Sequence, residues 1–242
     1  MRSKSVPSEF KWRHYEPSII LLCVRWYSSF PLSYRNLETI LKERGLDTDH
    51  TTIYRWVQHY APALERKIKK RLKTPNRSWR IDETYIKIRG KWHYLYRALD
   101  SDGNTIDFYL SKRRNKYAAW RFLRKCINAK HTLMPEKLTT DKDKAYPSAI
   151  AELKKEDILP DKSIHRTNKY LNNLIEQDHR QIKRKHDQAM GYFSYKTAYN
   201  TIRGIETMHM INKGQVSTIP FKEPRLIKNF IHRQFGLPGS IF

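Results

Sequence analysis

Three acidic side chains have the type and spacing for chemistry on a phosphodiester. Asp82 lies inside a predicted strand, Asp141 directly follows another predicted strand, and Glu176 lies on a predicted helix. Open α/β sheets commonly place ligands at the carboxyl ends of their strands. Oxygen ligands from separate elements can hold two Mg²⁺ ions about 3.5–4 Å apart, one activating the attacking oxygen and one stabilising the leaving oxygen. The three acids therefore predict metal-dependent phosphodiester chemistry.

The pair Asp82-Glu83 interrupts an otherwise apolar strand pattern. Carboxylates are depleted in strands and are costly on a buried face. Because neighbouring strand residues point to opposite faces, one of the two is expected to face solvent. The other needs a cation, hydrogen bonds or a function, and a bound metal would offset the desolvation of Asp82.

Two further acids compete for these roles. Asp143 could serve instead of Asp141, or it could cap the helix that follows. Asp178 falls with the apolar stripe of its predicted helix, whereas Glu176 falls on the polar side. There Glu176 could also form a surface ion pair with Arg180 of little energetic consequence. Helical periodicity leaves both Glu176 and Asp178 open.

The segments around these acids predict an α/β layer arrangement. Two strands rich in Ile, Tyr, Trp and Leu are joined at Arg89-Gly90-Lys91, and the turn signal DSDGN leads into a third. The predicted strands cover residues 79–89, 92–99, 105–110, 136–140 and 163–167. The predicted helices cover residues 116–129, 146–156, 170–186 and 195–212, with a short one at 225–235.

The N-terminal part predicts three helices, at residues 17–28, at 34–44 and from about 51 to an end at Ala61-Pro62. Two helices joined by a short Gly-containing link, in a basic chain, are typical of a helix-turn-helix. Its third helix would offer four side chains to bases or phosphates, namely Thr52, Arg55, Gln58 and His59. A plain helical hairpin is the alternative. The basic segment 63–77 fits a solvated helical connector or a contact to phosphates.

The composition favours a polyanionic partner. The 242 residues include 48 Lys and Arg against 24 Asp and Glu, a net charge of +24, and 39% are hydrophobic, as in a folded protein. An anionic membrane is the alternative, but no lipidation motif or basic amphipathic anchor is evident. Cys23 and Cys126 form no C-x-x-C motif, which disfavours structural zinc and a disulfide framework and predicts a reducing, cytosolic location.

Other residues with possible chemistry receive ordinary structural interpretations. Few soft ligands accompany the histidines, so hydrogen bonding is expected rather than metal binding for His165, His179 and His186. Burial in the core is expected for Trp56, Trp92 and Trp120, rather than stacking on nucleic-acid bases.

The chain resembles a bacterial insertion-sequence transposase of the DDE type, with the catalytic core of retroviral integrases and ribonuclease H, and more narrowly the IS-six family. The resemblance is carried by the segments WRIDETY at 79–85, Thr140-Asp141 and YLNNLIEQDHR at 170–180. Between Asp141 and Glu176 lie 34 residues, a spacing typical of that family. Lys183 follows Glu176 by seven residues, where the family has a basic residue.

The resemblance implies a helix-turn-helix domain at residues 1–62, a basic connector at 63–77, a ribonuclease H-like mixed sheet flanked by helices at 78–212, and a C-terminal tail at 213–242. It also implies a catalytic set of metal ligands for Mg²⁺, for which Mn²⁺ can substitute. These ligands are Asp82, Asp141 and Glu176. Arg180 and Lys183 are expected to bind DNA.

The activity implied is transposition in the cytoplasm of a bacterium, at the nucleoid and away from membranes. The enzyme would bind the terminal inverted repeats of its element, expose a 3′-hydroxyl at each end and join it to target DNA, giving a cointegrate. Holding two ends together predicts a homodimer or a larger synaptic complex. The alternatives are a helix-turn-helix regulator without catalysis and a ribonuclease H-like nuclease that joins no strands.

Overall fold

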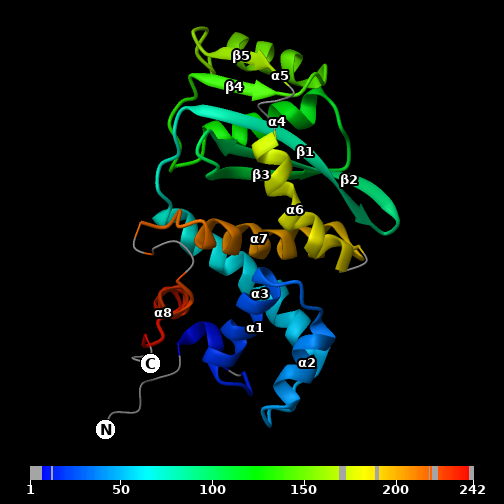
Figure 1. The fold of residues 1–242 in the computed structure, drawn as a ribbon, viewed down its shortest axis with the longest axis vertical. Coiled ribbons are helices and arrows are strands. Elements are labelled where there is room, and N and C mark those ends of the chain that lie inside the picture. The colour runs from blue at the N-terminus through cyan, green and yellow to red at the C-terminus, as the bar shows by residue number, and fades with distance from the viewer. Residues whose placement is uncertain are drawn as a thin grey trace. The chain divides into compact units, whose positions relative to one another are not determined.

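A five-stranded mixed sheet carries the acidic residues (Figure 1). In this computed structural model the strand order is β3-β2-β1-β4-β5; the first three strands pair antiparallel, and β4 and β5 continue the sheet in parallel with β1. The strands are β1 (Ser78–Ile88), β2 (Lys91–Asp100), β3 (Thr105–Ser111), β4 (Lys137–Thr140) and β5 (Ile164–Thr167). The structure describes residues 7–11, 13–168, 173–188, 191–217, 219 and 223–239.

Tight turns connect the antiparallel strands. Arg89 and Gly90 both have positive φ, 49° and 74°, which suits the two-residue turn that follows the right-handed twist of a hairpin. At the next turn the buried carboxylate of Asp100 accepts hydrogen bonds from the backbone N–H groups of Asn76, Asp102 and Asn104, at 2.8–3.0 Å. These bonds fix the turn that the DSDGN segment predicted.

Helices cover both faces of the sheet. α4 (Lys116–Ile127) and α5 (Ala145–Lys155) pack on one face, while α6 (Asn173–Gln188) crosses the other (Figure 1). The core between the sheet and the first two helices includes Trp79, Tyr96, Phe122 and Leu153. The mixed sheet flanked by helices is therefore confirmed. The first three residues of the helix expected at 170–186 lie outside the described residues.

A second set of helices forms its own core, in which Tyr60, Leu37 and Ile211 are buried. The members are α1 (Pro17–Ser29), α2 (Tyr34–Lys42), α3 (His50–Ile68), most of α7 (Tyr195–Asn212) and α8 (Pro224–Gln234), with short 3-10 turns at Ser8–Phe10 and Lys69–Arg71. Ser33 caps α2 through a reciprocal pair of hydrogen bonds with Asn36. All three N-terminal helices predicted from the sequence are present.

The predicted end of the third helix at Ala61-Pro62 is wrong, because α3 continues through Pro62 to Ile68. Proline cannot donate the helical bond to the carbonyl four residues earlier. That carbonyl belongs to Gln58 and instead accepts from Asn200 Nδ2 of α7 at 3.5 Å, while Arg203 Nη2 donates to the Pro62 carbonyl. Contacts with α7 thus compensate the proline, and residues 63–68 of the expected connector are helix with a buried apolar side.

The chain folds as two compact units, Met1–Leu72 with Tyr199–Phe242, and Lys73–Ala198. This division differs from the expected one, which assigned all of 78–212 to one domain and left 213–242 as a tail. The physical reason is apolar burial: Met208 and Ile211 of α7 and Ile227 and Ile231 of α8 complete the core of the N-terminal helices. Within the described residues, no helix has the length and apolar character that crossing a bilayer requires.

Gly204 allows α7 to approach its neighbours closely. A Cβ at this position would lie 2.8 Å from Ala61 Cβ and 2.8 Å from Ser28 Oγ. We expect Gly204→Ala to lower the free energy of unfolding by about 1–3 kcal/mol through overpacking. Denaturant unfolding measures this, and Lys196→Ala on the exposed side of the same helix is the control. Equal stability of Gly204→Ala and wild type would contradict the close packing.

Candidate active site

Strand β1 brings two carboxylates into the interior. The side chain of Asp82 is 16% exposed and that of Glu83 is 3% exposed, so the expectation that one of them faces solvent is wrong. They do occupy opposite faces: Glu83 accepts a short hydrogen bond from the buried Tyr146 hydroxyl of α5, whereas Asp82 lies near His179 of α6. Tyr146 of α5 covers Glu83 on one face, while Asp82 on the other face borders a cleft between β1 and α6.

Asp141 lies where β4 ends beside β1. Carboxylate oxygens of Asp82, Glu83 and Asp141 all lie within 4.8 Å of one another, a spacing that a metal ion could bridge. Asp141 directly follows the last residue of β4, as the sequence predicted. Its side chain is about one-third exposed, which leaves the group open to a ligand.

Glu176 shares a cleft with Asp82. The cleft has a volume of about 550 Å³ and lies between β1 and α6. Its lining consists of Asp82, Glu83, Thr84 and Tyr85 from β1 and Asn173, Glu176, Gln177, His179, Arg180 and Lys183 from α6. Five of the residues singled out from the sequence thus line one cleft or lie at its carboxylate cluster. They are Asp82, Asp141, Glu176, Arg180 and Lys183.

Asp178 is engaged elsewhere. Its Oδ2 lies 2.7 Å from Nη2 of Arg97, a β2 side chain that is completely buried, and Asp178 does not line the cleft. Glu176 lies two residues earlier on the same helix, and its exposed side chain lines the cleft. The side that periodicity assigned to Asp178 therefore carries the buried Ile175 and Ile182 together with this ion pair.

Asp143 supports the start of α5 from the position before Lys144, the N-cap residue of that helix. Its Oδ1 accepts from the N–H of Ala145, the first residue of α5, at 2.6 Å, and its own N–H donates to Asp141 Oδ1 at 3.0 Å. Asp143 Oδ2 also pairs with Arg114 Nη2 at 3.0 Å. Asp143 therefore orients Asp141 and starts α5.

Arg114 bridges the acidic cluster and was missed by sequence reasoning. Its Nε lies 2.5 Å from Glu83 Oε1, and its Nη2 lies 3.0 Å from Asp143 and 3.5 Å from Asp141. Arg114 belongs to a run of three cations after β3, in which no signal separates it from its neighbours. Its position beside Asn115, which caps α4, is what points it inward.

The electrostatics of the cleft fit a bound cation. Burial, followed by the nearby Glu83 carboxylate, raises the pKa of Asp82 from 3.8 to about 7. Burial also raises the pKa of Glu83, against the opposing hydrogen bond from Tyr146 and the charge of Arg114. His179, whose Nδ1 lies 3.8 Å from Asp82, has a pKa lowered to about 3 by burial and by Arg97, so it is neutral at pH 7. The Asp82 carboxylate thus lacks the compensating charge that a divalent ion would provide.

Two other histidines make hydrogen bonds, as predicted. His165 Nε2 lies 2.9 Å from Thr140 Oγ1, next to Asp141, and His186 Nε2 accepts from the N–H of Lys87 at 3.1 Å. The tryptophans differ from one another. Trp56 is buried and Trp120 half-buried, but Trp92 is 58% exposed, so its predicted core position is wrong. Trp92 lies near the end of the β1–β2 hairpin, away from the core beneath α4 and α5.

The residues proposed to read DNA lie on α3 with unequal exposure. Arg55 and His59 are exposed and Thr52 is half-buried. Gln58 Nε2 donates to Thr201 Oγ1 of α7 at 2.9 Å, so this side chain is held by α7.

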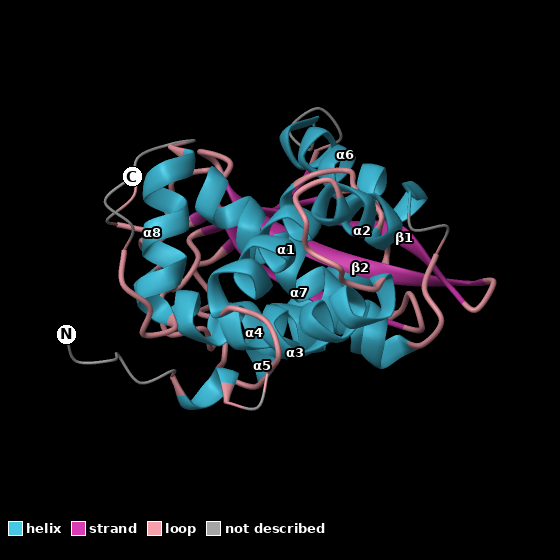
Figure 2. Ribbon diagram, turned by 90° about the horizontal axis from the view of Figure 1, so that it is seen from below, coloured by secondary structure: helices cyan, strands magenta, loops and turns pink. Residues whose placement is uncertain are grey.

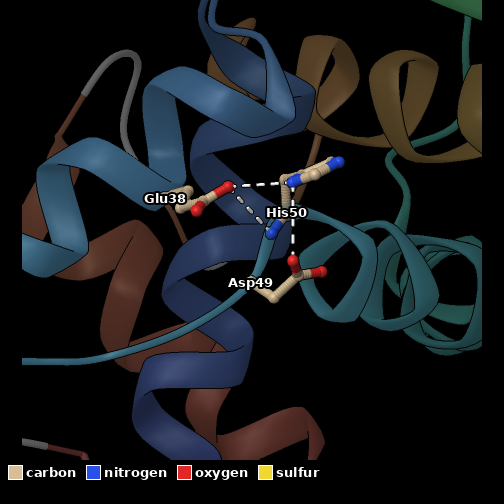
Figure 3. A group of neighbouring side chains, drawn as sticks. All are labelled: Glu38, Asp49 and His50. Atoms are coloured by element: carbon tan, nitrogen blue, oxygen red, sulfur yellow. Dashed lines mark hydrogen bonds and ion pairs between the residues drawn. The ribbon is translucent and has the colours of Figure 1, made fainter.

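A hydrogen-bonded cluster fixes the start of α3 (Figure 3). Glu38 of α2 accepts from the backbone N–H of His50 at 3.1 Å and lies 2.9 Å from its Nδ1, while Lys42 binds the other carboxylate oxygen at 2.9 Å. The hydrogen bond from Lys42, more than any other contact, lowers the pKa of Glu38. Asp49 caps α3 through the N–H of Thr51. These bonds set the geometry of the α2–α3 link.

Comparison with known proteins identifies the family. A model described as a DDE domain, of the IS240 transposase type, matches residues 76–215. The transposase for the insertion sequence-like element IS431mec of Staphylococcus aureus is 44% identical over 205 residues, covering 84% of this chain and 88% of that protein. The transposase for the insertion sequence element IS257 in transposon Tn4003, also of S. aureus, matches with the same identity and coverage.

The chain therefore belongs to the DDE transposases, enzymes that transfer polynucleotide strands. Within them it is of the IS-six type, to which the IS431mec and IS257 transposases belong, as the sequence predicted. Among solved structures, the HTLV-2 integrase catalytic core domain in complex with magnesium aligns with a TM-score of 0.42 and 17% identity, over 55% of this chain and 85% of that one. That likeness is too distant to carry an inference.

The buried pair between Arg97 and Asp178 generates a stability prediction. Replacing Arg97 with Met leaves Asp178 as an uncompensated buried charge, so we expect the free energy of unfolding to fall by about 3–5 kcal/mol. The double variant Arg97→Met/Asp178→Leu should recover most of that loss, and Glu176→Gln should change stability little. Urea unfolding distinguishes these cases. A change below about 1 kcal/mol in Arg97→Met would show that the pair is not desolvated.

The raised pKa of Asp82 predicts a pH dependence in metal-free protein. Between pH 3.8 and about 7 the folded state binds the proton more tightly than the unfolded state, so the free energy of unfolding should fall as pH rises through this window. In EDTA at pH 8, Asp82→Asn should therefore be more stable than wild type, by on the order of 2 kcal/mol. Added Mg²⁺ should stabilise wild type alone. Chemical unfolding at pH 5 and pH 8 tests this, and a less stable Asn variant at pH 8 would refute it.

Proposed function

We propose that the transposase cuts and joins DNA strands at the cleft between β1 and α6. The observation that carries the proposal is the gathering of Asp82 and Glu176 around one cleft, with Asp141 in the carboxylate cluster at its edge. These three acids come from a strand, a strand end and a helix that are distant in sequence. Separate elements of this kind can hold ligands in a fixed geometry while leaving room for a phosphate.

The proposed metal ligands are Asp82, Asp141 and Glu176. Their oxygens suit Mg²⁺, and Mn²⁺ can substitute for it. When bound, divalent ions activate the attacking water or hydroxyl and stabilise the leaving oxygen. The protein positions the site through neighbouring groups: Asp143 orients the proposed ligand Asp141, and Tyr146 and Arg114 hold Glu83 beside Asp82. Burial and the Glu83 carboxylate raise the pKa of Asp82 to about 7, which supports a cation as the ligand of this site.

Arg180 and Lys183 are proposed to contact the DNA backbone at the cleft. Both side chains are exposed and lie on the same helix as Glu176, on the lining of the cleft. A phosphate there would be positioned by cations close to the carboxylates. The large positive net charge of the chain supports duplex DNA as the partner.

The α2–α3 pair is proposed as a helix-turn-helix within an N-terminal DNA-binding domain that recognises the terminal inverted repeats. The exposed Arg55 and His59 and the half-buried Thr52 would contact DNA. For Gln58 we propose a supporting role through its bond to Thr201, with base contact requiring a change of rotamer. The Glu38–His50 cluster would fix the entry angle of α3 into a groove (Figure 3).

The proposed reaction exposes a 3′-hydroxyl at each element end and joins it to target DNA, giving a cointegrate in the bacterial cytoplasm. Two ends must be held at once, which requires a homodimer or a larger synaptic complex. A nuclease that only hydrolyses DNA is the second candidate, because the same carboxylates and metal serve both reactions. The products distinguish the two.

Strand transfer with Mg²⁺ tests the proposal. Labelled duplexes that carry the element's ends are incubated with wild type and with Asp82→Asn, Asp141→Asn, Glu176→Gln and Asp178→Asn. We expect joined products with wild type and their loss in the first three variants. A missing ligand removes charge stabilisation of the transition state and should lower the rate of strand joining by about a hundredfold or more. End binding, measured by gel shift, should persist.

Asp178→Asn is the matched control on the same helix. It should retain joining when folded, since its partner is Arg97 and it is not a proposed ligand. If Glu176→Gln still joins strands while folded Asp178→Asn does not, Asp178 and not Glu176 would be the metal ligand on α6. Shortened strands without joined products would favour the nuclease.

A further inference from the structure

The β1–β2 hairpin extends past the helices that cover the sheet (Figures 1 and 2). Aromatic side chains are exposed on this part of the hairpin. Tyr85 is 47% exposed and Trp92 is 58% exposed. Large aromatic groups on a strand are ordinarily covered by a helix, a partner strand or a ligand. At this point of the sheet the described residues provide no such cover for the two rings.

These rings lie on one face of the hairpin. The strand register places Tyr85 opposite Tyr94 and Lys87 opposite Trp92, so all four side chains share that face. The Tyr85 ring centroid lies 6.2 Å from that of Trp92, with the planes 80° apart, and 5.4 Å from that of Tyr94. Lys87 Nζ lies 5.7 Å from the Trp92 centroid. The result is an aromatic surface with a cation beside it.

The opposite face of the hairpin is anchored, which makes the aromatic surface rigid. Ile86 and Ile88 are buried, and His186 accepts from the N–H of Lys87. At the turn, the N–H of Arg89 donates to the Tyr192 carbonyl at 2.8 Å, and Arg89 Nε donates to the Phe193 carbonyl at 2.7 Å. A ligand would therefore meet rings that are already held in place, at little cost in conformational entropy.

The aromatic surface begins at the proposed active site. Tyr85 itself lines the cleft that contains Asp82 and Glu176. Tyr85 lies three positions along β1 from Asp82, a rise of about 10 Å, or roughly three base steps of DNA. A DNA end whose scissile phosphate reached the carboxylates would therefore bring its terminal bases to Tyr85 and Trp92.

Charge favours DNA over a second protein chain as the occupant. Residues 84–99 contain no Asp or Glu, and Lys87, Arg89 and Lys91 are all exposed around the hairpin turn. A second copy of this chain, with a net charge of +24, would bring like charge to this surface. Aromatic rings flanked by cations are the usual platform for unpaired bases, because every base offers a π-face and every nucleotide a phosphate.

We propose that Tyr85 and Trp92 stack on an unpaired terminal base about three nucleotides from the scissile phosphate, while Lys87 contacts the phosphate of that nucleotide. This inference rests on the proposed function, since it assumes that DNA ends enter the cleft. The role is that of positioning residues: stacking stabilises the frayed end and directs its strand across the carboxylates. No covalent step involves the hairpin.

The test compares the affinity for two DNA probes. Both carry the terminal repeat of the element; one is fully paired, and the other has its terminal base pairs mismatched so that the end is frayed. Wild type should bind the frayed end more tightly. Trp92→Ala should weaken binding of the frayed end by about tenfold, as loss of one stacked base predicts, and leave the paired probe within about twofold. Trp92→Phe should retain most of the preference.

A 2-aminopurine at the frayed position gives an independent readout, because stacking on Trp92 should quench its fluorescence and Trp92→Ala should restore it. Leu133→Ala, which removes another exposed apolar side chain from the same unit, is the matched control and should change nothing. If Trp92→Ala does not fold, judged by circular dichroism and thermal unfolding, Tyr85→Leu serves in its place.

The outcomes separate this inference from the proposed function. Joining by wild type, with equal binding and quenching in wild type and Trp92→Ala, would overturn the stacking role and leave the transposase reaction intact. Loss of a dimer in Trp92→Ala, seen by sedimentation, with both probes weakened equally, would overturn it in favour of a protein interface. Absence of joining by wild type on either probe would count against the proposed function itself.

Discussion

The structure depends on holding several carboxylates close together in a partly buried place. Asp82, Glu83 and Asp141 lie within 4.8 Å of one another, and like charges at such distances repel strongly when water is scarce. Arg114 offsets part of this charge from one side, and the Tyr146 hydroxyl supports Glu83 from beneath the sheet. The part that remains uncompensated is centred on Asp82, on the side that faces the cleft. The fold thus tolerates a local excess of negative charge that a divalent ion would relieve. Burial first, and then the neighbouring Glu83 carboxylate, raise the pKa of Asp82.

The surrounding elements maintain this arrangement through buried polar contacts as well as apolar packing. The ion pair between Arg97 and Asp178 connects β2 to α6, so the helix that carries Glu176 has a fixed rotation relative to the sheet. His186 binds the backbone of β1 from the next part of the same helix. Because a buried pair is costly to break, a shift of α6 along or around its axis would be unfavourable. The buried ion pair of Asp178 thereby fixes the rotation of α6 at which Glu176, and not Asp178, lines the cleft.

Much of this could be predicted from the sequence where local rules act alone. Strand and helix positions followed from periodicity and turn residues. Asp82 and Asp141 stood out because carboxylates in or directly after strands need an explanation, whereas Glu176 was favoured by the family resemblance. The failures share a different cause, namely partners distant in sequence. Helix α3 continues through Pro62 because α7 supplies Asn200 and Arg203 as hydrogen-bond donors. Glu83 is buried because Tyr146 and Arg114 contact it. Trp92 is exposed because the hairpin extends past the helices that cover the sheet. The choice between Glu176 and Asp178 likewise required the position of Arg97, which no helical pattern contains.

The whole chain is positively charged, whereas the cleft is locally negative. These two charge distributions act at different distances from the protein. The whole chain carries a net charge of +24, which attracts DNA from a distance and weakens with salt, whereas the cleft concentrates carboxylates that repel phosphate at short range. A phosphodiester can therefore approach the acids closely only when metal ions lie between them. The proposed phosphate contacts, Arg180 and Lys183, are exposed side chains of α6 that line the same cleft. The proposed function therefore separates binding of DNA from chemistry on DNA: the surface cations would supply the first, and the acids together with a metal the second.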